Sequence, residues 1–508
     1  MRGRTAVVIG LGVAGQAATQ LLVDDGVTVT VYDQVRTDLP ENLVDKVEGL
    51  RTVVDPDLLA DCLLEAAPDL IVVSPGVPEV SPAVTRTREA GVEVIGEVEL
   101  AWRSAQASRS PFSNEAKEAP LWLAITGTNG KTTVVGMTES IMRAAEIDAI
   151  QTGNVGYPIT RAVREHHEIL AVELSSAQLA LSTTVAPWAS ICLNVDVDHL
   201  DWHGSATAYR DAKARVYDRV HKARLYFADD PVVAAMAQEA KSSSQLVPLV
   251  FGAVEAGQMG ITGGHLIDLA FLEDPADDRK ERGKERGAED VMGEIVGPPV
   301  TVDLSSIPLL RAALQTQEGQ NSPLVRDALA AAALARSVGV GADAILQGLR
   351  HFQMAPHRFA LIPTDDSVNW IDDSKATNIH AAAAALGGVE PGTAVWIVGG
   401  DTKGQDLTSL IEDAASIVKA AVIIGADQAP LRTIFAEVAP TLQTVAVEGK
   451  GGPQEWMGDV VRACATIASP GDTVLLAPAC ASWDQFPSYG VRGDLFREAV
   501  LEIVGGGR

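Results

Sequence analysis

Short apolar runs recur along this chain, and most of them end at a glycine or a polar residue just before a helical pattern begins. Buried strands of a parallel sheet have this appearance, because helices cover both faces of such a sheet. We therefore predict a series of strands that alternate with helices. The strands are expected at residues 5–9, 27–32, 70–73, 92–95, 121–126, 169–173, 190–195, 368–372, 394–398, 421–425 and 473–477.

Apolar residues at helical spacing follow several of these runs. They predict helices ending near residue 23, spanning residues 97–102 and 209–217, and starting at residue 134, with two more within residues 324–350. The alanine-rich stretch 328–335 is flanked by Arg326 and Arg336, so a packed helix is expected there. No apolar run reaches the roughly 18 residues of a membrane span, and no signal peptide is recognisable.

A chain of 508 residues is too long for one hydrophobic core. The pattern predicts an α/β protein of three domains. We expect a Rossmann-like domain at residues 1–103, a linker at 104–119, a central P-loop-type ATPase α/β domain at 120–354, and a second Rossmann-like domain at 355–508.

Composition and charge narrow the range of possible functions and partners. Hydrophobic residues make up 47% and charged residues 21%, as in folded globular proteins. The net charge of −27 argues against nucleic acid or an anionic membrane surface as a partner. Four scattered cysteines without metal-ligand spacing indicate reduced thiols in a cytoplasmic protein. The dense charges at 274–290 predict a solvated loop.

The most informative stretch is residues 121–133, where an apolar run leads into Gly-Thr-Asn-Gly-Lys-Thr-Thr. A helix start offers unpaired N–H groups and a positive dipole end, and glycines let the backbone close around phosphate. Lys131 would reach a terminal phosphate, and Thr132 would hold Mg²⁺. A longer P-loop would need glycine at Ile125, so a purely structural turn is the alternative. The phosphate-binding residues are predicted to be Gly127, Thr128, Asn129, Gly130, Lys131, Thr132 and Thr133.

Acidic and imidazole side chains follow the next strands. Glu173 ends a buried strand and suits a Mg²⁺ ligand, although alone it would be an ordinary charge at the rim of a sheet. His199 lies among carboxylates in the segment 196–201, where it either ligates a second cation or belongs to an exposed loop. Helical periodicity predicts that Lys213 is a surface lysine.

A second glycine-rich loop, residues 10–15, follows the first strand, and Asp33 follows the next one. This arrangement is typical of a nucleotide-binding Rossmann unit, with NAD and a uridine nucleotide as alternative ligands. The Ser74-Pro75-Gly76 turn follows another strand, at the sheet edge where ligands bind. A dehydrogenase would usually continue with the half of the domain that binds nicotinamide, but here a new phosphate loop begins at residue 127. This order favours two separate nucleotide sites over one dinucleotide site.

The last third of the chain offers its own candidates. Arg358 is a possible phosphate clamp, because a guanidinium matches phosphate oxygens with two parallel hydrogen bonds. Lys375, Lys403 and Ser482 each come just after a predicted strand, so one sheet edge can present them together. Two ammonium groups and a hydroxyl suit a dicarboxylate such as glutamate.

The loop at 126–133 resembles the phosphate loop of the Mur ligases and the folylpolyglutamate synthetases. Residues 372–378 (Asp-Asp-Ser-Lys-Ala-Thr-Asn) and 477–486 (Ala-Pro-Ala-Cys-Ala-Ser-Trp-Asp-Gln-Phe) resemble the Mur ligases that add D-glutamate, and the resemblance covers nearly the whole chain. It implies ATP-dependent ligation of D-glutamate to UDP-N-acetylmuramoyl-L-alanine in peptidoglycan precursor synthesis. ATP would phosphorylate the substrate carboxylate, and the amine would then attack the acyl phosphate.

The resemblance also implies residue roles. Thr132 and Glu173 resemble ligands of the Mg²⁺ that bridges ATP phosphates, His199 resembles a ligand of a second Mg²⁺, and Lys213 occupies the place of a carbamylated lysine that helps to hold it. Asn154 resembles a contact to the muramoyl group. The implied uridine diphosphate residues are Gly12, Val13, Ala14, Gly15, Asp33, Arg36, Ser74, Pro75 and Gly76. The implied D-glutamate residues are Lys375, Thr377, Lys403, Ser482, Trp483 and Tyr489.

One departure from the family pattern concerns the segment whose asparagines lie near the adenine of ATP in the family. Where the family usually has His-Asn-x-x-Asn, this chain has Pro323-Leu324 and then Asp327. Two rival functions also stand beside the ligase. One is a folylpolyglutamate synthetase, which would lack the first Rossmann-like domain. The other is an NAD-dependent oxidoreductase fused to an NTPase, which would change nicotinamide absorbance with its substrates. We expect a cytoplasmic monomer whose three domains close over the substrates.

Overall fold

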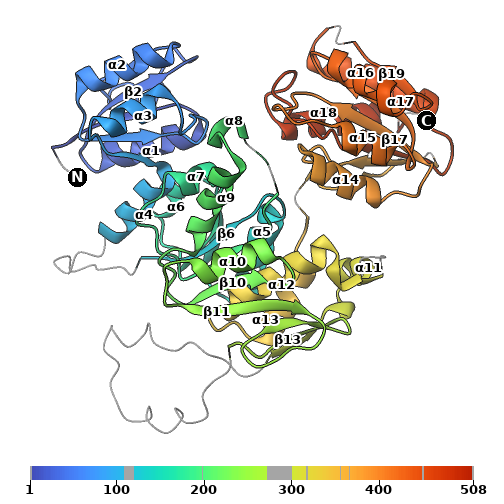
Figure 1. Ribbon diagram of the computed structural model, residues 1–508, viewed down its shortest axis with the longest axis horizontal. Helices are drawn as coiled ribbons and strands as arrows, with labels where there is room; N and C mark the ends of the chain where they lie inside the picture. The colour runs from blue at the N-terminus through green and yellow to red at the C-terminus, as the bar shows by residue number, and fades with distance from the viewer. Residues whose placement is uncertain are drawn as a thin grey trace. The chain divides into compact units, whose positions relative to one another are not determined.

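The computed structural model describes residues 3–107, 119–196, 198, 200–271, 300–315, 319–354, 356–364, 367–448 and 451–505. The expected charged loop at 274–290, most of the expected linker at 104–119, and His199 lie outside the described residues. The chain divides into two compact units, Met1–Gln353 and Met354–Arg508 (Figure 1). Strands and helices alternate in both, which confirms the predicted α/β fold. Across the described ranges, no helix combines the length and the apolar character that crossing a membrane requires.

The first unit contains two sheets, and the smaller one is wholly parallel with the strand order β3-β2-β1-β4-β5. Its apolar strands are buried on both faces, because the helices pack on both sides of the sheet. The strands are β1 (Thr5–Ile9), β2 (Thr28–Asp33), β3 (Gly49–Thr52), β4 (Leu70–Val73) and β5 (Val94–Gly96), and the helices are α1 (Val13–Asp24), α2 (Pro56–Ala66), α3 (Pro82–Glu89) and α4 (Glu97–Ala107).

The larger sheet of the first unit has nine strands in the order β14-β13-β12-β11-β10-β9-β6-β8-β7. Strand β13 pairs antiparallel with both β12 and β14, and all the other pairings are parallel. The strands are β6 (Leu121–Thr126), β7 (Ala149–Gly153), β8 (Ile169–Glu173), β9 (Ala189–Cys192), β10 (Ala223–Phe227), β11 (Gln245–Phe251), β12 (Met259–Thr262), β13 (His265–Asp268) and β14 (Val300–Asp303).

Three long helices cover one face of this sheet: α5 (Lys131–Ala144), α12 (Pro323–Arg336) and α13 (Ala342–His351). The alanine-rich stretch 328–335 lies in α12 and is completely buried, so the packed helix expected there is present. Short elements complete the layer on the other face and the connections. They are α6 (Ile159–Ala162), α7 (Ser176–Ala180), α8 (Leu200–His203), α9 (Ala206–Ala214), α10 (Pro231–Glu239), α11 (Pro308–Leu314) and the 3₁₀ turns η1 (Arg215–Tyr217), η3 (Leu304–Ser306) and η4 (Gly319–Asn321).

Helix α4 joins the two sheets of the first unit. Its Glu99 carboxylate accepts hydrogen bonds from the backbone N–H groups of Thr183 (2.8 Å) and Thr184 (2.9 Å), which belong to the larger sheet's domain. The Trp102 ring packs edge-to-face on Trp122 of β6, with ring centroids 5.0 Å apart. The small sheet is therefore fastened to the large one by both polar and apolar contacts.

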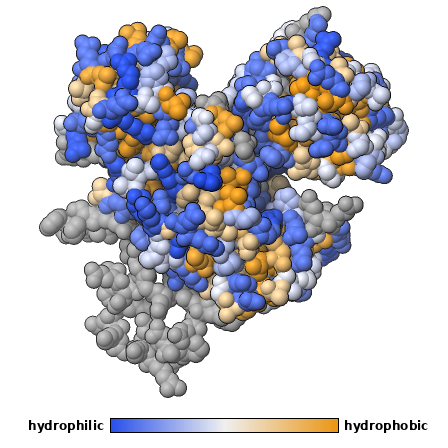
Figure 2. All heavy atoms as spheres, in the orientation of Figure 1, coloured by the Kyte–Doolittle hydropathy of each residue, from blue (hydrophilic) through white to orange (hydrophobic). Residues whose placement is uncertain are grey.

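The second unit contains a six-stranded sheet in the order β15-β16-β20-β17-β18-β19, in which only β15 is antiparallel. The strands are β15 (Ala360–Ile362), β16 (Asn369–Asp372), β17 (Ala394–Gly399), β18 (Val418–Ile424), β19 (Gln443–Ala446) and β20 (Thr473–Leu476). The helices are α14 (Ile379–Gly387), α15 (Thr408–Ala414), α16 (Ala429–Val438), α17 (Pro453–Ile467) and α18 (Tyr489–Ile503). Hydrophilic side chains, interspersed with apolar ones, are spread over the faces of both units that Figure 2 shows, as expected of an acidic chain.

Candidate active site

The phosphate loop connects β6 to α5, as the sequence predicts. Gly127 (φ +152°) and Gly130 (φ +86°) take backbone conformations that other residues rarely adopt. A Cβ on Gly130 would lie 2.6 Å from Oδ1 of Asp327 and 2.9 Å from Leu193. Only glycine fits here, and the close approach places the Asp327 carboxylate beside the loop.

Side chains from distant segments hold this loop. Oδ1 of Asn194 accepts the N–H groups of Thr128 and Asn129, both at 2.9 Å. The Thr128 hydroxyl accepts the N–H of Asp196 at 2.9 Å and lies 2.9 Å from the Tyr209 hydroxyl. Sequence reasoning missed Asn194 and Tyr209, because neither belongs to the glycine-rich motif. The only available signal for Asn194 was its place at the end of a predicted strand.

Glu173 ends β8 next to the loop, and its side chain is 2% exposed. Its Oε2 accepts a hydrogen bond from the Thr132 hydroxyl at 2.8 Å, and its Oε1 accepts one from the Asn154 amide at 2.9 Å. The structure thus brings together Thr132, Glu173 and Asn154, which were predicted as site residues from three separate segments. A carboxylate, a hydroxyl and an amide are oxygen-rich neighbours of the kind that Mg²⁺ prefers.

No group of three or more His, Cys, Asp or Glu side chains forms a cation site within the described ranges. Mg²⁺ in nucleotide enzymes keeps several waters and uses few protein ligands besides the phosphates, so a site of this kind would not need three such side chains. The predicted second-cation residue, His199, cannot be placed, since it falls outside the described residues.

Two lysines meet at the Gly127 carbonyl. Nζ of Lys131 donates to Gly127 O (2.8 Å) and Thr128 O (2.9 Å), while Nζ of Lys213 donates to Gly127 O at 2.8 Å. Lys213 also lies 4.8 Å from the centre of the Tyr209 ring. Both amino groups therefore lie at the loop that the sequence predicts to bind phosphate.

The prediction that Lys213 is a surface lysine is wrong, since its side chain is only 2% exposed. Helix α9 packs its last turn against the phosphate loop, which turns Tyr209, Ala212 and Lys213 inward. Burial, followed by repulsion from the Lys131 ammonium, lowers the pKa of Lys213 from 10.5 to about 7. A large share of these amines is therefore neutral and nucleophilic near pH 7.

The glycine-rich loop of the small sheet and the Ser74 turn lie against each other. Ser74 Oγ donates to the Gly10 carbonyl at 3.1 Å, and a Cβ on Gly15 would lie 1.8 Å from the same oxygen. Gly12, Val13 and Ala14 lie between them at the start of α1, and Val13 is 70% exposed. The predicted residues of the two loops thus form one continuous edge.

Asp33 holds this edge through backbone contacts. Its carboxylate accepts the N–H groups of Leu11 (2.6 Å), Val35 (2.9 Å) and Arg36 (2.9 Å). Burial raises the pKa of Asp33, but these three hydrogen bonds outweigh it and leave the pKa below its usual value. The carboxylate is thus ionised at neutral pH and fastens the glycine loop to the end of β2.

The Ser74–Gly76 turn also touches the domain of the larger sheet. The Trp202 indole N–H of α8 donates to the Pro75 carbonyl at 2.9 Å. The neighbouring His203 lies with Nε2 2.9 Å from the Ser176 hydroxyl, three residues after Glu173. Helix α8 therefore connects the small-sheet edge to the strand end that carries Glu173.

The second unit brings the candidate glutamate residues to one sheet edge. Strands β16, β20 and β17 are adjacent and parallel, and Lys375, Ser482 and Lys403 follow their carboxyl ends in that order. Nζ of Lys375 lies 5.4 Å from the Tyr489 ring centre. The Lys403 N–H donates to the Asp401 carboxylate at 2.9 Å. Ser482 is buried and Trp483 is 71% exposed, whereas Thr377 is half-buried.

Arg358 opens the second unit between His357 and Phe359, both of which have positive φ angles (+63° and +43°). Its Nε is buried without a hydrogen-bond partner among the described residues. The Phe359 N–H donates to Asp373 at 3.2 Å, and burial raises the pKa of Asp373 to about 6.

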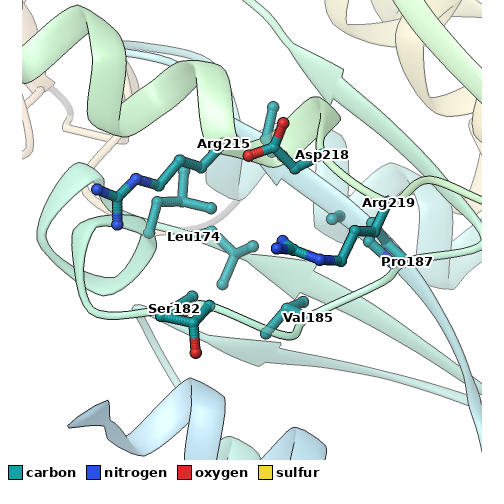
Figure 3. A pocket seen from close by; sticks show the side chains of 11 residues that line it. Leu174, Ser182, Val185, Pro187, Arg215, Asp218 and Arg219 are labelled. Atoms are coloured by element: carbon teal, nitrogen blue, oxygen red, sulfur yellow. The ribbon is translucent and has the colours of Figure 1, made fainter. Parts of the chain in front are cut away.

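Leu174 is one of the residues that line a small pocket in the first unit (Figure 3). Its volume of about 20 Å³ is enough for one water molecule and too small for any of the proposed substrates. Apolar side chains including Val185 and Pro187 line it, together with Arg215 and Arg219. It is therefore a packing gap and not a substrate site.

Comparison with protein families gives three matches along the chain. The Mur ligase MurD-like N-terminal domain matches residues 4–96, the Mur ligase middle domain matches residues 125–256, and the Mur ligase glutamate ligase domain matches residues 357–480.

Curated relatives match over nearly their full length. A protein of Thermobifida fusca (strain YX) is 39% identical over 99% of this chain and 100% of its own. One of Streptomyces coelicolor is 37% identical over 99% of this chain and 98% of its own. Both are named UDP-N-acetylmuramoylalanine–D-glutamate ligase.

Solved structures share the fold at low sequence identity. The MurF ligase of Thermotoga maritima in complex with ADP has a TM-score of 0.53 at 14% identity and covers 100% of this chain and 96% of its own. The UDP-N-acetylmuramate–alanine ligase of the same organism has a TM-score of 0.51 at 16% identity, over 98% of this chain and 99% of its own.

Proposed function

The chain belongs to the Mur ligase family, and we propose that it joins D-glutamate to UDP-N-acetylmuramoyl-L-alanine with ATP, in the synthesis of peptidoglycan precursors. The observation that carries this proposal is the alignment with relatives of that name over 99% of the chain at 37–39% identity. The geometry agrees, because a phosphate loop with two lysines and a buried carboxylate suits the activation of a carboxylate by ATP.

The first chemical step transfers a phosphoryl group from ATP to the alanyl carboxylate of the UDP-linked substrate. The residues of the loop, Gly127 to Thr133, bind the phosphates with their N–H groups. Lys131 exchanges its two carbonyl partners for phosphate oxygens and offsets the charge that develops on the transferred group. Near-attack placement of the carboxylate supplies much of the remaining acceleration.

Thr132 and Glu173 would hold Mg²⁺ beside the ATP phosphates, because their side chains already lie 2.8 Å apart at the loop. A bound Mg²⁺ supplies charge neutralisation of the phosphate oxygens. We assign a second Mg²⁺ to His199 and to a carbamate on Lys213. The neutral form of the buried Lys213 amine is the form that reacts with CO₂, and its low pKa supports this assignment.

The uridine diphosphate is assigned to the small-sheet edge: Gly12, Val13, Ala14, Gly15, Asp33, Arg36, Ser74, Pro75 and Gly76. Asn154 is assigned to the muramoyl group, since its amide already touches Glu173 and would orient the acyl end near the phosphates. D-glutamate is assigned to the second unit: Lys375, Thr377, Lys403, Ser482, Trp483 and Tyr489. Arg358 is assigned to the nucleotide phosphates, because its buried Nε has no hydrogen-bond partner within the described ranges.

The second step is attack of the D-glutamate amine on the acyl phosphate, with loss of phosphate from a tetrahedral intermediate. Lys375 and Lys403 would bind the two carboxylates and leave the amine free to react. We further propose domains at residues 1–103, 120–354 and 355–508, a linker at 104–119, a cytoplasmic location and a monomeric state.

The proposed function is tested by phosphate release from ATP with UDP-N-acetylmuramoyl-L-alanine and a panel of D- and L-amino acids. We expect release only when D-glutamate and the UDP-linked substrate are both present, with formation of an amide product whose mass is the sum of the two substrates less one water. Equal release with L-glutamate, or release that needs no amino acid, would contradict the assignment. A change in nicotinamide absorbance would favour the oxidoreductase instead.

A further inference from the structure

Arg492 is a buried cation of the second unit. It lies in the first turn of α18, and its side chain is among the least exposed of the second unit. Among the residues that the structure describes, no carboxylate forms an ion pair with it. Burial lowers the pKa of Arg492 to about 10, which is still far above neutral pH. Burying a charge is unfavourable unless hydrogen bonds compensate for the lost water, so the hydrogen-bond partners of the Arg492 guanidinium are informative.

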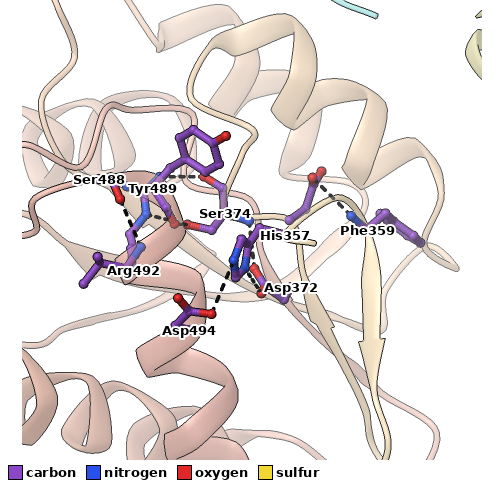
Figure 4. A network of polar contacts seen from close by, with 10 residues as sticks. His357, Phe359, Asp372, Ser374, Ser488, Tyr489, Arg492 and Asp494 are labelled. Atoms are coloured by element: carbon purple, nitrogen blue, oxygen red, sulfur yellow. Dashed lines mark hydrogen bonds and ion pairs between the residues drawn. The ribbon is translucent and has the colours of Figure 1, made fainter. Parts of the chain in front are cut away.

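The Arg492 guanidinium connects two segments, and Figure 4 shows the one that carries Ser374. Nε donates to the Ser374 hydroxyl at 2.9 Å and Nη2 donates to the Ser374 carbonyl at 2.8 Å. Nη1 donates to the Cys480 carbonyl at 3.2 Å. Ser374 follows β16 and Cys480 follows β20, so one side chain bridges the ends of two adjacent strands.

The contacted groups adjoin the candidate glutamate residues. The Ser374 carbonyl belongs to the peptide bond that leads into Lys375, and the Cys480 carbonyl lies two residues before Ser482. The Ser374 hydroxyl in turn donates to the carbonyl of Tyr489 at 2.8 Å. Arg492 therefore fixes the backbone on both sides of the proposed subsite.

The same bridge extends to the third candidate segment. Ala481 donates its N–H to the Asp401 carbonyl at 2.8 Å, and the Asp401 N–H donates to the Ala481 carbonyl at 3.1 Å. The Asp401 carboxylate accepts the N–H of Lys403. A displacement of the Cys480 peptide would thus be passed to Lys403 as well as to Ser482.

We propose that Arg492 is a positioning residue of the amino-acid subsite, where its planar guanidinium sets the spacing between the segments that carry Lys375, Ser482 and Lys403. This inference rests on the proposed function, which assigns those segments to D-glutamate. A guanidinium is required because it directs several N–H groups in a fixed plane, whereas a lysine ammonium at the same place reaches fewer acceptors.

The test compares Arg492→Lys, Ser374→Ala and Arg497→Lys in the full-length enzyme. Arg497 is an exposed arginine on the same helix and serves as the matched control. Because a misplacement of about 1 Å can cost a large factor in rate, we expect Arg492→Lys to raise the KM for D-glutamate at least tenfold. The KM values for ATP and the UDP-linked substrate should stay within about twofold.

Ser374→Ala removes the hydroxyl that accepts from Arg492 Nε and donates to the Tyr489 carbonyl. This second variant tests the proposal even if Arg492→Lys does not fold. We expect it to raise the KM for D-glutamate about threefold with unchanged far-ultraviolet circular dichroism. Arg497→Lys should behave as wild type. A purely structural role would instead lower the melting temperature or kcat with no selective effect on D-glutamate.

The outcomes separate the two proposals. If wild type depends on D-glutamate but folded Arg492→Lys and Ser374→Ala keep its KM, this inference is wrong and the proposed function stands. If wild-type phosphate release ignores D-glutamate, the proposed function is wrong and this inference falls with it.

Discussion

The attachment of helix α4 to the larger sheet gives a sharp stability prediction, centred on Glu99. The Glu99 side chain is fully buried, and its Oε2 accepts the N–H groups of Thr183 and Thr184. Its Oε1 accepts the hydroxyls of Thr183 (3.1 Å) and Thr184 (2.6 Å) and the Nε of Arg103 (2.7 Å). One carboxylate therefore satisfies five donors at the junction of two domains.

Substituting Glu99→Gln keeps the size of the side chain but replaces one acceptor oxygen with an amide NH₂. That NH₂ group faces donors, and the remaining oxygen carries no full charge. Hydrogen bonds to a charged group contribute roughly 1.5–3 kcal/mol each, and they do not add. Removing one partner from a buried charged network typically costs about 3–5 kcal/mol. We expect a loss of this size in the free energy of unfolding of the first unit.

The pH dependence has a definite sign. Burial raises the pKa of Glu99, but hydrogen bonds from Thr184, Thr183 and Arg103 outweigh it, so the folded-state pKa lies below the ordinary value of 4.5. The stabilisation is therefore complete above about pH 4.5 and is lost as the pH falls through the folded-state pKa. Glu99→Gln should abolish this part of the acid sensitivity.

Urea unfolding followed by circular dichroism at pH 7 and pH 4 measures the effect, and hydrogen exchange of α4 amides locates it. Glu93→Gln is the matched control, because Glu93 pairs with the same Arg103 at 2.8 Å but is 48% exposed. An exposed pair contributes about 0–1 kcal/mol. If Glu99→Gln cost no more than Glu93→Gln, the reasoning about the buried carboxylate would be refuted.

Two further predictions concern the phosphate loop. Lys131→Ala removes the ammonium that would offset phosphate charge, so the rate of phosphate release should fall at least about a hundredfold with folding unchanged. The control Lys241→Ala changes an exposed lysine and should match wild type. A near-normal rate for Lys131→Ala would exclude the proposed role. Lys213, with a pKa of about 7, should be neutral in about half the molecules at pH 7. At constant dissolved CO₂, ¹³C-bicarbonate should give a carbamate NMR signal that rises with pH through about 7 and is absent from Lys213→Ala; a signal that survives this substitution, or rises only above pH 9, would contradict the assignment.

The residues at the ends of parallel strands were predictable from the sequence. A parallel sheet presents all its carboxyl ends at one edge, so the sequence alone already places Thr132 and Glu173 near each other. The same rule anticipated that Lys375, Lys403 and Ser482 share an edge of the last sheet. Such clusters are predictable because the residue type and the end of the strand can both be read from the local sequence.

Contacts across the fold could not be predicted in this way. Asn194 and Tyr209 hold the phosphate loop from 66 and 81 residues away from Thr128, and no local pattern marks them. Periodicity placed Lys213 on the surface because it separates helix faces by hydropathy alone. It cannot show that the polar face of α9 lies against a backbone carbonyl that accepts the amine.

Asp33 illustrates how a correct motif can still give an incomplete role. The motif suggests an acid that binds the ribose of a nucleotide, yet this carboxylate already accepts three backbone N–H groups. Both of its oxygens are thus already engaged by the backbone. The Leu11 N–H lies inside the glycine-rich loop, and losing this bond would release the loop from the end of β2. Asp33 therefore contributes to the proposed uridine diphosphate site mainly by holding the loop in place, and a direct ligand contact is at most its second task.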